Sequence, residues 1–238
     1  MLTTIEWHTL VGKALSPGSA IVDLGANTGR FARKMRQRFD AEVFALEPNP
    51  HLLDAINPSG DPRIHLRPWA ATGNPVDDLP FQIDSTNPLA SRIDAPAADG
   101  AEQIRVRGVS LPEILDWTGR PFVDLVKVDV EGAEVDLLLK TDGETLARIG
   151  QLTIEFHDFC GLITADQVGQ VKRHLNSAGF YGVNMSRIGH QDTIFLNRRY
   201  FPLGFADRMR LHIYKYRFGA ARLFAKLRHG ETWYEKFD

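Results

Sequence analysis

The stretch Asp23-Leu24-Gly25-Ala26-Asn27-Thr28-Gly29-Arg30-Phe31 indicates the fold class. It follows a short apolar run at residues 20–24, which predicts a buried strand. It leads into residues 28–39, where Phe31 and Met35 fall on one face of a helix. A glycine-containing turn between a buried strand and a helix is where doubly wound α/β sheets bind nucleoside cofactors. The sequence therefore predicts an α/β domain with its ligand at the carboxyl ends of the strands.

The form of the turn narrows the choice of cofactor. Gly25 and Gly29 let the backbone turn tightly, whereas Asn27 stands where a dinucleotide-binding loop carries its second glycine. A pyrophosphate needs the closest approach to the backbone, so this turn favours a nucleoside without one, such as S-adenosylmethionine. The turn residues expected at the cofactor are Asp23, Gly25, Ala26, Asn27, Thr28, Gly29 and Phe31.

Two further strand ends extend the expected cofactor site. Residues 42–46 predict a second strand that ends at Glu47 and Pro48, where an acid accepts both hydroxyls of a ribose. The same acid would repel a 2'-phosphate, which argues against NADP. Residues 63–69 predict a third strand, and Trp69-Ala70 at its end is expected to flank the adenine.

Strand and helix signals alternate along the rest of the chain, as in a mostly parallel sheet. Further strands are expected at residues 123–130, 152–156, 180–185 and 193–197, the last two forming an antiparallel pair. Helices are expected at residues 2–15, after Asn49, and at residues 110–117, 132–140 and 164–178. N-cap signals stand at Asn49 before Pro50 and at the capping-box pair Ser110 and Glu113. The prediction is a doubly wound, mostly parallel seven-stranded sheet of the Rossmann-like type.

The pattern changes between the third and fourth predicted strands. Residues 80–83 and 104–109 alternate like short strands and flank a polar loop at residues 84–100. Loops of this length inside a domain are usually functional or disordered. We expect a small antiparallel insertion placed to cover a site.

Charged residues interrupt the predicted fourth strand near its carboxyl end. Lys127 and Asp129 alternate there with apolar residues, and buried charges are costly unless they pair or coordinate something. Asp129 is expected beside the first strand, facing the reactive end of the cofactor, and Glu131 follows it. The presence of Glu134 can be explained by structure alone, because the helix dipole stabilises acidic side chains at the start of a helix.

The predicted fifth strand ends in Glu155-Phe156-His157. Glu155 and His157 point to the same side by the two-residue period of a strand, and His157 is the candidate base. A structural role is the alternative for this histidine. Asp129, Glu155 and His157 also offer metal ligands, but no dense ligand cluster is visible in the sequence. A divalent metal is therefore the less favoured alternative, and no metal residue is predicted.

These segments together resemble the FkbM family of methyltransferases, over about Ile21 to Asn197. The most specific piece is Lys127-Val128-Asp129-Val130-Glu131-Gly132-Ala133-Glu134, close to the family signature K-[IMV]-D-V-E-G-x-E. The first turn matches the family without change, and Glu155-Phe156-His157 is similar to its E-x-H strand end. Residues 110–113 depart from it, with Ser-Leu-Pro-Glu where Thr-Leu-Asp-Asp is common.

The resemblance implies a class I methyltransferase fold, S-adenosylmethionine as methyl donor, and O-methylation, often of a sugar or polyketide hydroxyl. We expect a small-molecule, sugar or lipid-linked acceptor and no nucleic acid. His157 would act as base, Asp129 as an orienting acid with Glu131 beside it, and Lys127 as the support of these carboxylates. Two alternatives remain: a non-catalytic cofactor-binding protein, and a nicotinamide-dependent oxidoreductase, which Asn27 disfavours.

Composition bounds the domain organisation and the compartment. Within 238 residues there is one cysteine, Cys160, and no signal-peptide core or bilayer-spanning run, so a cytoplasmic protein is expected. Residues 1–199 would form the methyltransferase domain and residues 200–238 a basic amphipathic helical tail. From Arg198 onward there are ten Lys and Arg against four Asp and Glu. Docking of this tail on the body or in a homodimer is favoured over contact with a membrane surface.

Overall fold

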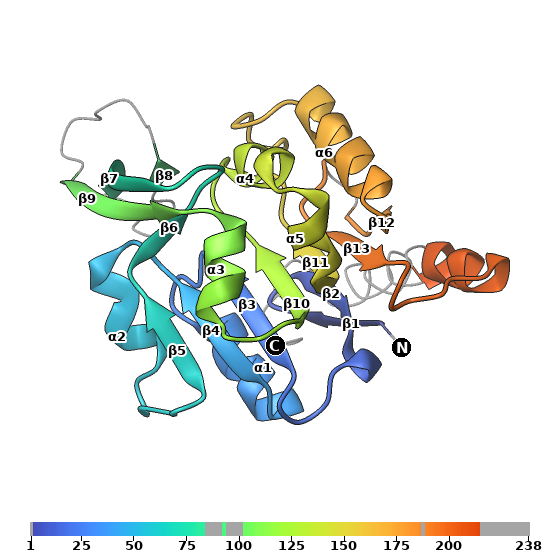
Figure 1. Cartoon of the computed structure of the whole chain (residues 1–238), viewed down its shortest axis with the longest axis horizontal. Coiled ribbons are helices and arrows are strands. Elements are labelled where there is room, and N and C mark those ends of the chain that lie inside the picture. Colours follow the sequence, from blue (N-terminus) through green and yellow to red (C-terminus); the bar gives the residue numbers. More distant parts are fainter. Residues whose placement is uncertain (1, 84–91, 94–101, 187–188, 215–238) are drawn as a thin grey trace, which may run out of the picture.

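The computed structural model describes residues 2–83, 92–93, 102–186 and 189–214. At its centre lies a seven-stranded sheet covered by helices (Figure 1). In spatial order its strands are β12 (Phe180–Asn184), β13 (Thr193–Asn197), β11 (Ile149–Ile154), β10 (Val123–Val128), β3 (Ala20–Leu24), β4 (Glu42–Leu46) and β5 (Ile64–Arg67). In this sheet β13 runs in the direction opposite to that of all the other strands. The predicted doubly wound sheet of the class I methyltransferase type is confirmed.

Helical layers cover both faces of this sheet. One layer holds α1 (Arg30–Phe39), the 3-10 turn η2 (Pro50–Leu52) and α2 (Leu53–Ile56). The other layer holds α3 (Leu111–Trp117), α4 (Glu134–Lys140), α5 (Gly143–Ala147) and α6 (Ala165–Ser177). Successive residues of β3 alternate between the layers, with Ile21 packing toward α1 and Val22 toward the other side. Burial on both faces explains why the central strands read as nearly continuous apolar runs.

The predicted helix signals have structural counterparts. Ser110 and Glu113 form the capping box of α3, with the Glu113 carboxylate accepting from the Ser110 backbone N–H at 3.0 Å. The Asn49 side chain caps η2 by accepting from the His51 N–H at 3.0 Å. These caps satisfy backbone donors that have no partner within the helix.

The prediction of a leading helix at residues 2–15 is wrong, because the chain begins with a hairpin. Strands β1 (Leu2–Ile5) and β2 (His8–Val11) pair antiparallel around Glu6 and Trp7, and η1 (Gly12–Ala14) follows. Glu6 and Trp7 have φ of 44° and 69°, as a two-residue hairpin turn requires.

Side chains from distant parts of the chain fix this hairpin to the body. The Gln151 side chain accepts from the Val11 N–H at 2.8 Å, and the Asp192 carboxylate accepts from the Thr9 N–H at 2.9 Å. Contacts with distant residues therefore stabilise residues 2–11 as a hairpin, although their local sequence pattern predicted a helix. One consequence is that His8 of β2 is buried in the molecule.

The predicted insertion is a second, four-stranded sheet. Its order is β6 (Trp69–Ala71), β9 (Glu102–Val109), β7 (Val76–Ile83) and β8 (Arg92–Ile93). Its pairs are antiparallel except β6 with β9, which is parallel. The predicted third strand therefore divides, with β5 in the central sheet and Trp69 in the second. Of the polar loop at residues 84–100, all but residues 92–93 lie outside the described residues.

The described part of the predicted tail docks on the body. A helix runs over residues 205–214, where Leu211 is buried against Leu2, Val11 and neighbouring apolar residues. The Tyr214 hydroxyl donates to the Leu2 carbonyl at 3.1 Å. Residues 215–238 lie outside the described residues, so the tail boundary, a homodimer and membrane contact stay predictions. In the described ranges, the helices all fall short of the length and apolarity that crossing a bilayer requires.

Candidate functional site

The predicted cofactor turn passes directly over the end of β10. Gly25, Asn27 and Gly29 have φ of 73°, 52° and 75°. A Cβ atom on Gly25 would lie 1.9 Å from the Asp129 carbonyl oxygen, so no other residue fits there. Asn27 tolerates its left-handed backbone, and its side-chain oxygen accepts from the Thr28 N–H at 2.7 Å. The turn is thus held tightly between β3 and β10.

Glu47 braces the turn from the end of β4. Its Oε2 accepts from the Asn27 N–H at 2.8 Å and its Oε1 from the Asn49 N–H at 2.9 Å. Glu47 is buried, and this burial raises the pKa of its carboxyl group despite the two hydrogen bonds. A carboxylate has further lone pairs, so these bonds leave acceptor capacity for a ribose. That role stays a prediction.

The remaining predicted cofactor residues differ in position. Ala26, Phe31 and Pro48 are buried beside the turn. Ala70 instead packs with Leu79, Phe81 and Val106 in the core of the second sheet.

Trp69 lies in an aromatic contact beside α3. Its ring packs edge-on against Trp117 at 5.5 Å, with the guanidinium groups of Arg67 and Arg107 over it at 5.6 and 5.1 Å. The adenine contact expected of Trp69 stays a prediction.

Lys127 joins the ends of β3 and β10. Its Nζ lies 3.1 Å from Asp23 Oδ1 and 3.3 Å from Asp129 Oδ2, and it donates to the Gly25 carbonyl at 2.8 Å. Burial disfavours the ammonium, but the two carboxylates outweigh burial and raise the pKa of Lys127. Lys127 in turn holds the pKa of Asp129 below its usual range against the effect of burial. The charges predicted in this strand are paired, as buried charges must be.

His157 lies among three carboxylates at the end of β11. Its Nδ1 is 2.8 Å from Glu134 Oε1, and its Nε2 lies 3.4 Å from Glu131 Oε2 and 3.7 Å from Asp129 Oδ1. Burial alone would disfavour the imidazolium. The hydrogen bond to Glu134 and the nearby carboxylates nevertheless raise the pKa of His157 to about 9.

Glu134 has a larger role than the helix-dipole explanation gave it. It is fully buried, and its Oε1 accepts from the backbone N–H of Val130 and Gly132 at 3.2 and 3.1 Å as well as facing His157. It therefore folds residues 130–132 around the histidine. Its position as the last acid of the family-like signature was the available signal.

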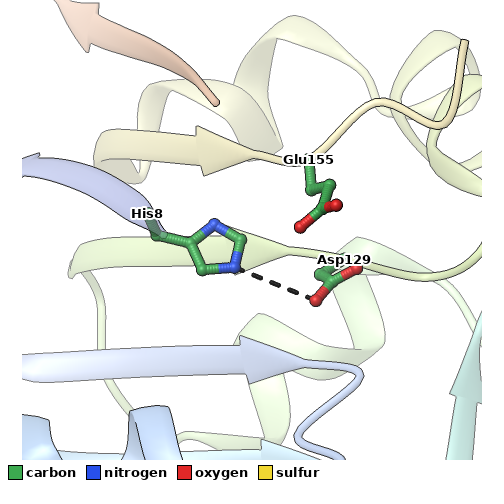
Figure 2. Close-up of side chains that lie close together, drawn as sticks. All are labelled: His8, Asp129 and Glu155. Atoms are coloured by element: carbon green, nitrogen blue, oxygen red, sulfur yellow. Dashed lines mark ion pairs between the residues drawn. The ribbon is translucent and has the colours of Figure 1, made fainter. Parts of the chain in front are cut away.

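His8 is the site residue that the sequence analysis missed. Figure 2 shows His8, Asp129 and Glu155 pointing toward one another from β2 and from the ends of β10 and β11. His8 Nε2 lies 3.8 Å from Asp129 Oδ2. Burial and the charge of Asp129 raise the pKa of Glu155 to about 7. No local signal marks His8, since it reaches the site only through the hairpin.

The structure thus brings together a compact set that we call the acid–histidine cluster. Its members are His8, Lys127, Asp129, Glu131, Glu134, Glu155 and His157. Two triads within it have potential metal-ligand atoms within 4.8 Å of one another: His8, Asp129, Glu155 and Asp129, Glu131, His157. The dense ligand cluster that was not visible in the sequence is formed by the fold.

Known proteins resemble parts of this chain. Residues 23–181 match a family described as the Methyltransferase FkbM domain. The chain is 30% identical over 142 residues to the hexuronic acid methyltransferase AglP of Haloferax volcanii, covering 57% of this chain and 54% of that protein. It is 35% identical over 80 residues to the AMB antimetabolite synthetase AmbE of Pseudomonas aeruginosa, covering 34% and 4%. The chain thus spans about half of the first relative and a small part of the second.

Solved structures include neighbours of low sequence identity. An rRNA methylase from Streptococcus thermophilus has a TM-score of 0.46 at 13% identity, covering 77% of this chain and 88% of that chain. The precorrin-6y C5,15-methyltransferase from Geobacter metallireducens has a TM-score of 0.41 at 14% identity, covering 76% and 79%.

Proposed function

This chain belongs to the FkbM family of methyltransferases, and we propose that it methylates a hydroxyl oxygen of a sugar, glycolipid, polyketide or related small molecule. The methyl donor is S-adenosylmethionine. The observation that carries the proposal is the acid–histidine cluster, which lies at the ends of β10 and β11 against the Gly25 turn. A hydroxyl is a weak nucleophile, and such a cluster can orient it and accept its proton.

The residues around the turn suit this donor. Glu47 is placed for ribose hydroxyls, and Asp23 and Asp129 provide negative charge near the end of β3 for a positively charged methionine moiety. The acid–histidine cluster with Asp23 contains five carboxyl groups and Lys127, so it favours a cationic ligand over a pyrophosphate. When bound, S-adenosylmethionine would supply a methyl carbon on a sulfonium sulfur, which leaves as a neutral thioether when the methyl group is transferred.

Asp129 is the residue best placed to orient the acceptor. Its Oδ2 is held by Lys127, and its Oδ1 faces His157 at 3.7 Å. A carboxylate held by a buried ammonium loses little further freedom when it accepts a hydrogen bond from a substrate hydroxyl. Such positioning is the main contribution a protein can make to this kind of displacement.

We assign removal of the hydroxyl proton to Glu155. Among the described residues none donates a hydrogen bond to its carboxylate, and its side chain is partly exposed beside Asp129. His157, the base predicted from the sequence, has Nδ1 on Glu134 and Nε2 toward two other carboxylates. That arrangement suits a positioning role better than proton removal.

The proposal is tested with the purified chain in two steps. Calorimetry should show binding of S-adenosylmethionine, and a screen with radiolabelled methyl donor should then give transfer to a hydroxylated acceptor. The name of AglP makes hexuronic acids and their glycosides the first acceptors to try. Asp129→Asn should retain the fold and lose transfer. Absence of donor binding, or equal transfer by Asp129→Asn, would overturn the proposal.

A further inference from the structure

We propose that Asp129, Glu131 and His157 bind a divalent transition-metal ion, and that Glu134 orients the histidine for it. The site would lie beside the place proposed for the acceptor. The inference goes beyond methyl transfer, and metal binding can be measured without either the donor or an acceptor.

The Nε2 atom of His157 faces two carboxylates at distances that suit a shared metal. It lies 3.4 Å from Glu131 Oε2 and 3.7 Å from Asp129 Oδ1. A charge-assisted N–H···O bond measures about 2.7–2.9 Å, so these contacts are too long for a shared proton. Two ligands about 2.1 Å from a tetrahedral ion lie about 3.4 Å apart. His157 is 4% exposed, so water does not readily replace a partner at this atom.

Glu134 determines which nitrogen of His157 faces the two carboxylates. Its Oε1 accepts from Nδ1 at 2.8 Å, and the hydrogen bonds from Val130 and Gly132 hold that oxygen in place. When an ion displaces the proton of Nε2, Nδ1 keeps its proton toward Glu134 and the lone pair of Nε2 points into the triad. Metal-ligating histidines are commonly oriented by a carboxylate in this way.

The backbone of Glu131 brings the second carboxylate to the triad. Glu131 has a φ of 50°, a left-handed conformation that residues other than glycine rarely adopt. The turn folds the chain back after Asp129, so that both carboxylates face His157 although they are two residues apart. Such conformations occur at sites where the surrounding structure enforces them.

The second triad, drawn in Figure 2, suits a cation less well. The oxygen of Asp129 that faces His8 is Oδ2, and it already lies 3.3 Å from Lys127 Nζ and 3.8 Å from His8 Nε2. An ion there would lie next to a buried ammonium and be repelled by it. The Oδ1 side faces His157 instead, which makes the triad of Asp129, Glu131 and His157 the better site.

The donor set indicates the class of ion. One imidazole nitrogen and two carboxylate oxygens suit Mn²⁺, Fe²⁺ or Zn²⁺, whereas Mg²⁺ prefers oxygen ligands. Two carboxylates balance the charge of a divalent ion. Three protein ligands leave coordination positions open, as catalytic metal sites do.

To test the proposal, the whole chain is freed of metal with a chelator, dialysed, and titrated with Mn²⁺ alone. Electron paramagnetic resonance measures free and bound Mn²⁺, and pulsed spectra report coupling to an imidazole nitrogen. We expect one bound equivalent with that coupling. His157→Asn should remove the coupling, and Glu131→Gln should weaken binding at least about tenfold. Glu134→Gln should weaken it about tenfold to a hundredfold.

Two histidine variants provide the controls. His174 lies on α6, where its ring contacts the Thr141 carbonyl. The variant His174→Asn should therefore bind Mn²⁺ like the parent chain. His8→Asn should retain the nitrogen coupling. Circular dichroism and thermal unfolding show whether each variant is folded. If His157→Asn does not fold, the weaker Mn²⁺ binding expected of Glu131→Gln still tests the site, because Glu131 is partly exposed. No binding by the folded parent chain at millimolar Mn²⁺, or coupling lost in His8→Asn and kept in His157→Asn, overturns the proposal. Either result leaves the methyl-transfer assay free to decide the proposed function.

Discussion

The buried ammonium of Lys127 lies 3.3 Å from the carboxylate of Asp129, which follows directly after the end of β10. It also lies 3.1 Å from Asp23, on the neighbouring strand β3. One cation therefore ties the two strand ends that carry the cofactor turn and the acid–histidine cluster. The geometry of both parts depends on this residue.

Replacing Lys127 with methionine should destabilise the fold strongly. The buried Asp23 and the half-buried Asp129 would lose their counter-charge, and breaking a buried pair costs about 3–5 kcal/mol. Urea denaturation measures the loss. Lys140→Met is the matched control, because loss of its exposed pair with Asp136 should change stability by less than about 1 kcal/mol. Similar effects of the two variants would contradict the pairing described above.

Replacing Gly25 with alanine should disrupt the turn. The added Cβ would meet the Asp129 carbonyl at 1.9 Å, and the backbone there is left-handed. Gly60→Ala is the control, with a φ of 65° but nothing within 4 Å of the added atom. Overpacking should make Gly25→Ala less stable than the control by about 1–3 kcal/mol and abolish binding of S-adenosylmethionine. Equal stability and donor affinity of the two variants would show that the turn is not tightly held.

Glu155→Gln should slow methyl transfer and leave donor binding nearly unchanged. Loss of a general base lowers the rate by about a hundredfold to ten-thousandfold. Single-turnover rates at saturating donor, with calorimetry of donor binding, separate the two effects. Glu144→Gln on α5 serves as an exposed control. A rate for Glu155→Gln within about threefold of the parent would remove Glu155 as the base.

Affinity for S-adenosylmethionine should fall on acidification through the pKa of Glu47. Burial raises that pKa, so protonation begins at a higher pH than the usual value of about 4.3. The protonated group is the weaker acceptor for the Asn27 N–H and for a ribose hydroxyl. Calorimetry between about pH 5 and 8 should show weaker binding at the acid end. In Glu47→Gln the affinity should be low and should fall less on acidification than in the parent chain, and a parent-like pH profile would refute this role.

Much of the central sheet follows from local sequence. Residues 20–24 and 42–46 were predicted to the residue, since each is an apolar run ended by a turn signal. Lys127 and Asp129 were expected to have partners because buried charges are costly, and the structure pairs them with each other.

The features that escaped prediction depend on contacts between distant residues. The hairpin at residues 2–11 is fixed by Gln151 and Asp192, which lie far away in the chain. His8 could not be assigned to the site without that hairpin. Trp69 was placed at a third strand end, but pairing of β6 with β9 carries it into the second sheet.

O-methylation is tested most directly with S-adenosylmethionine whose methyl group is labelled with ¹³C. The chain transfers this methyl group to an accepted sugar, and NMR of the product shows which atom carries it. We expect a labelled methyl ether on one hydroxyl oxygen, formed by the parent chain and lost in Asp129→Asn. A label on nitrogen or carbon, or the same ether formed by Asp129→Asn, would contradict the proposal.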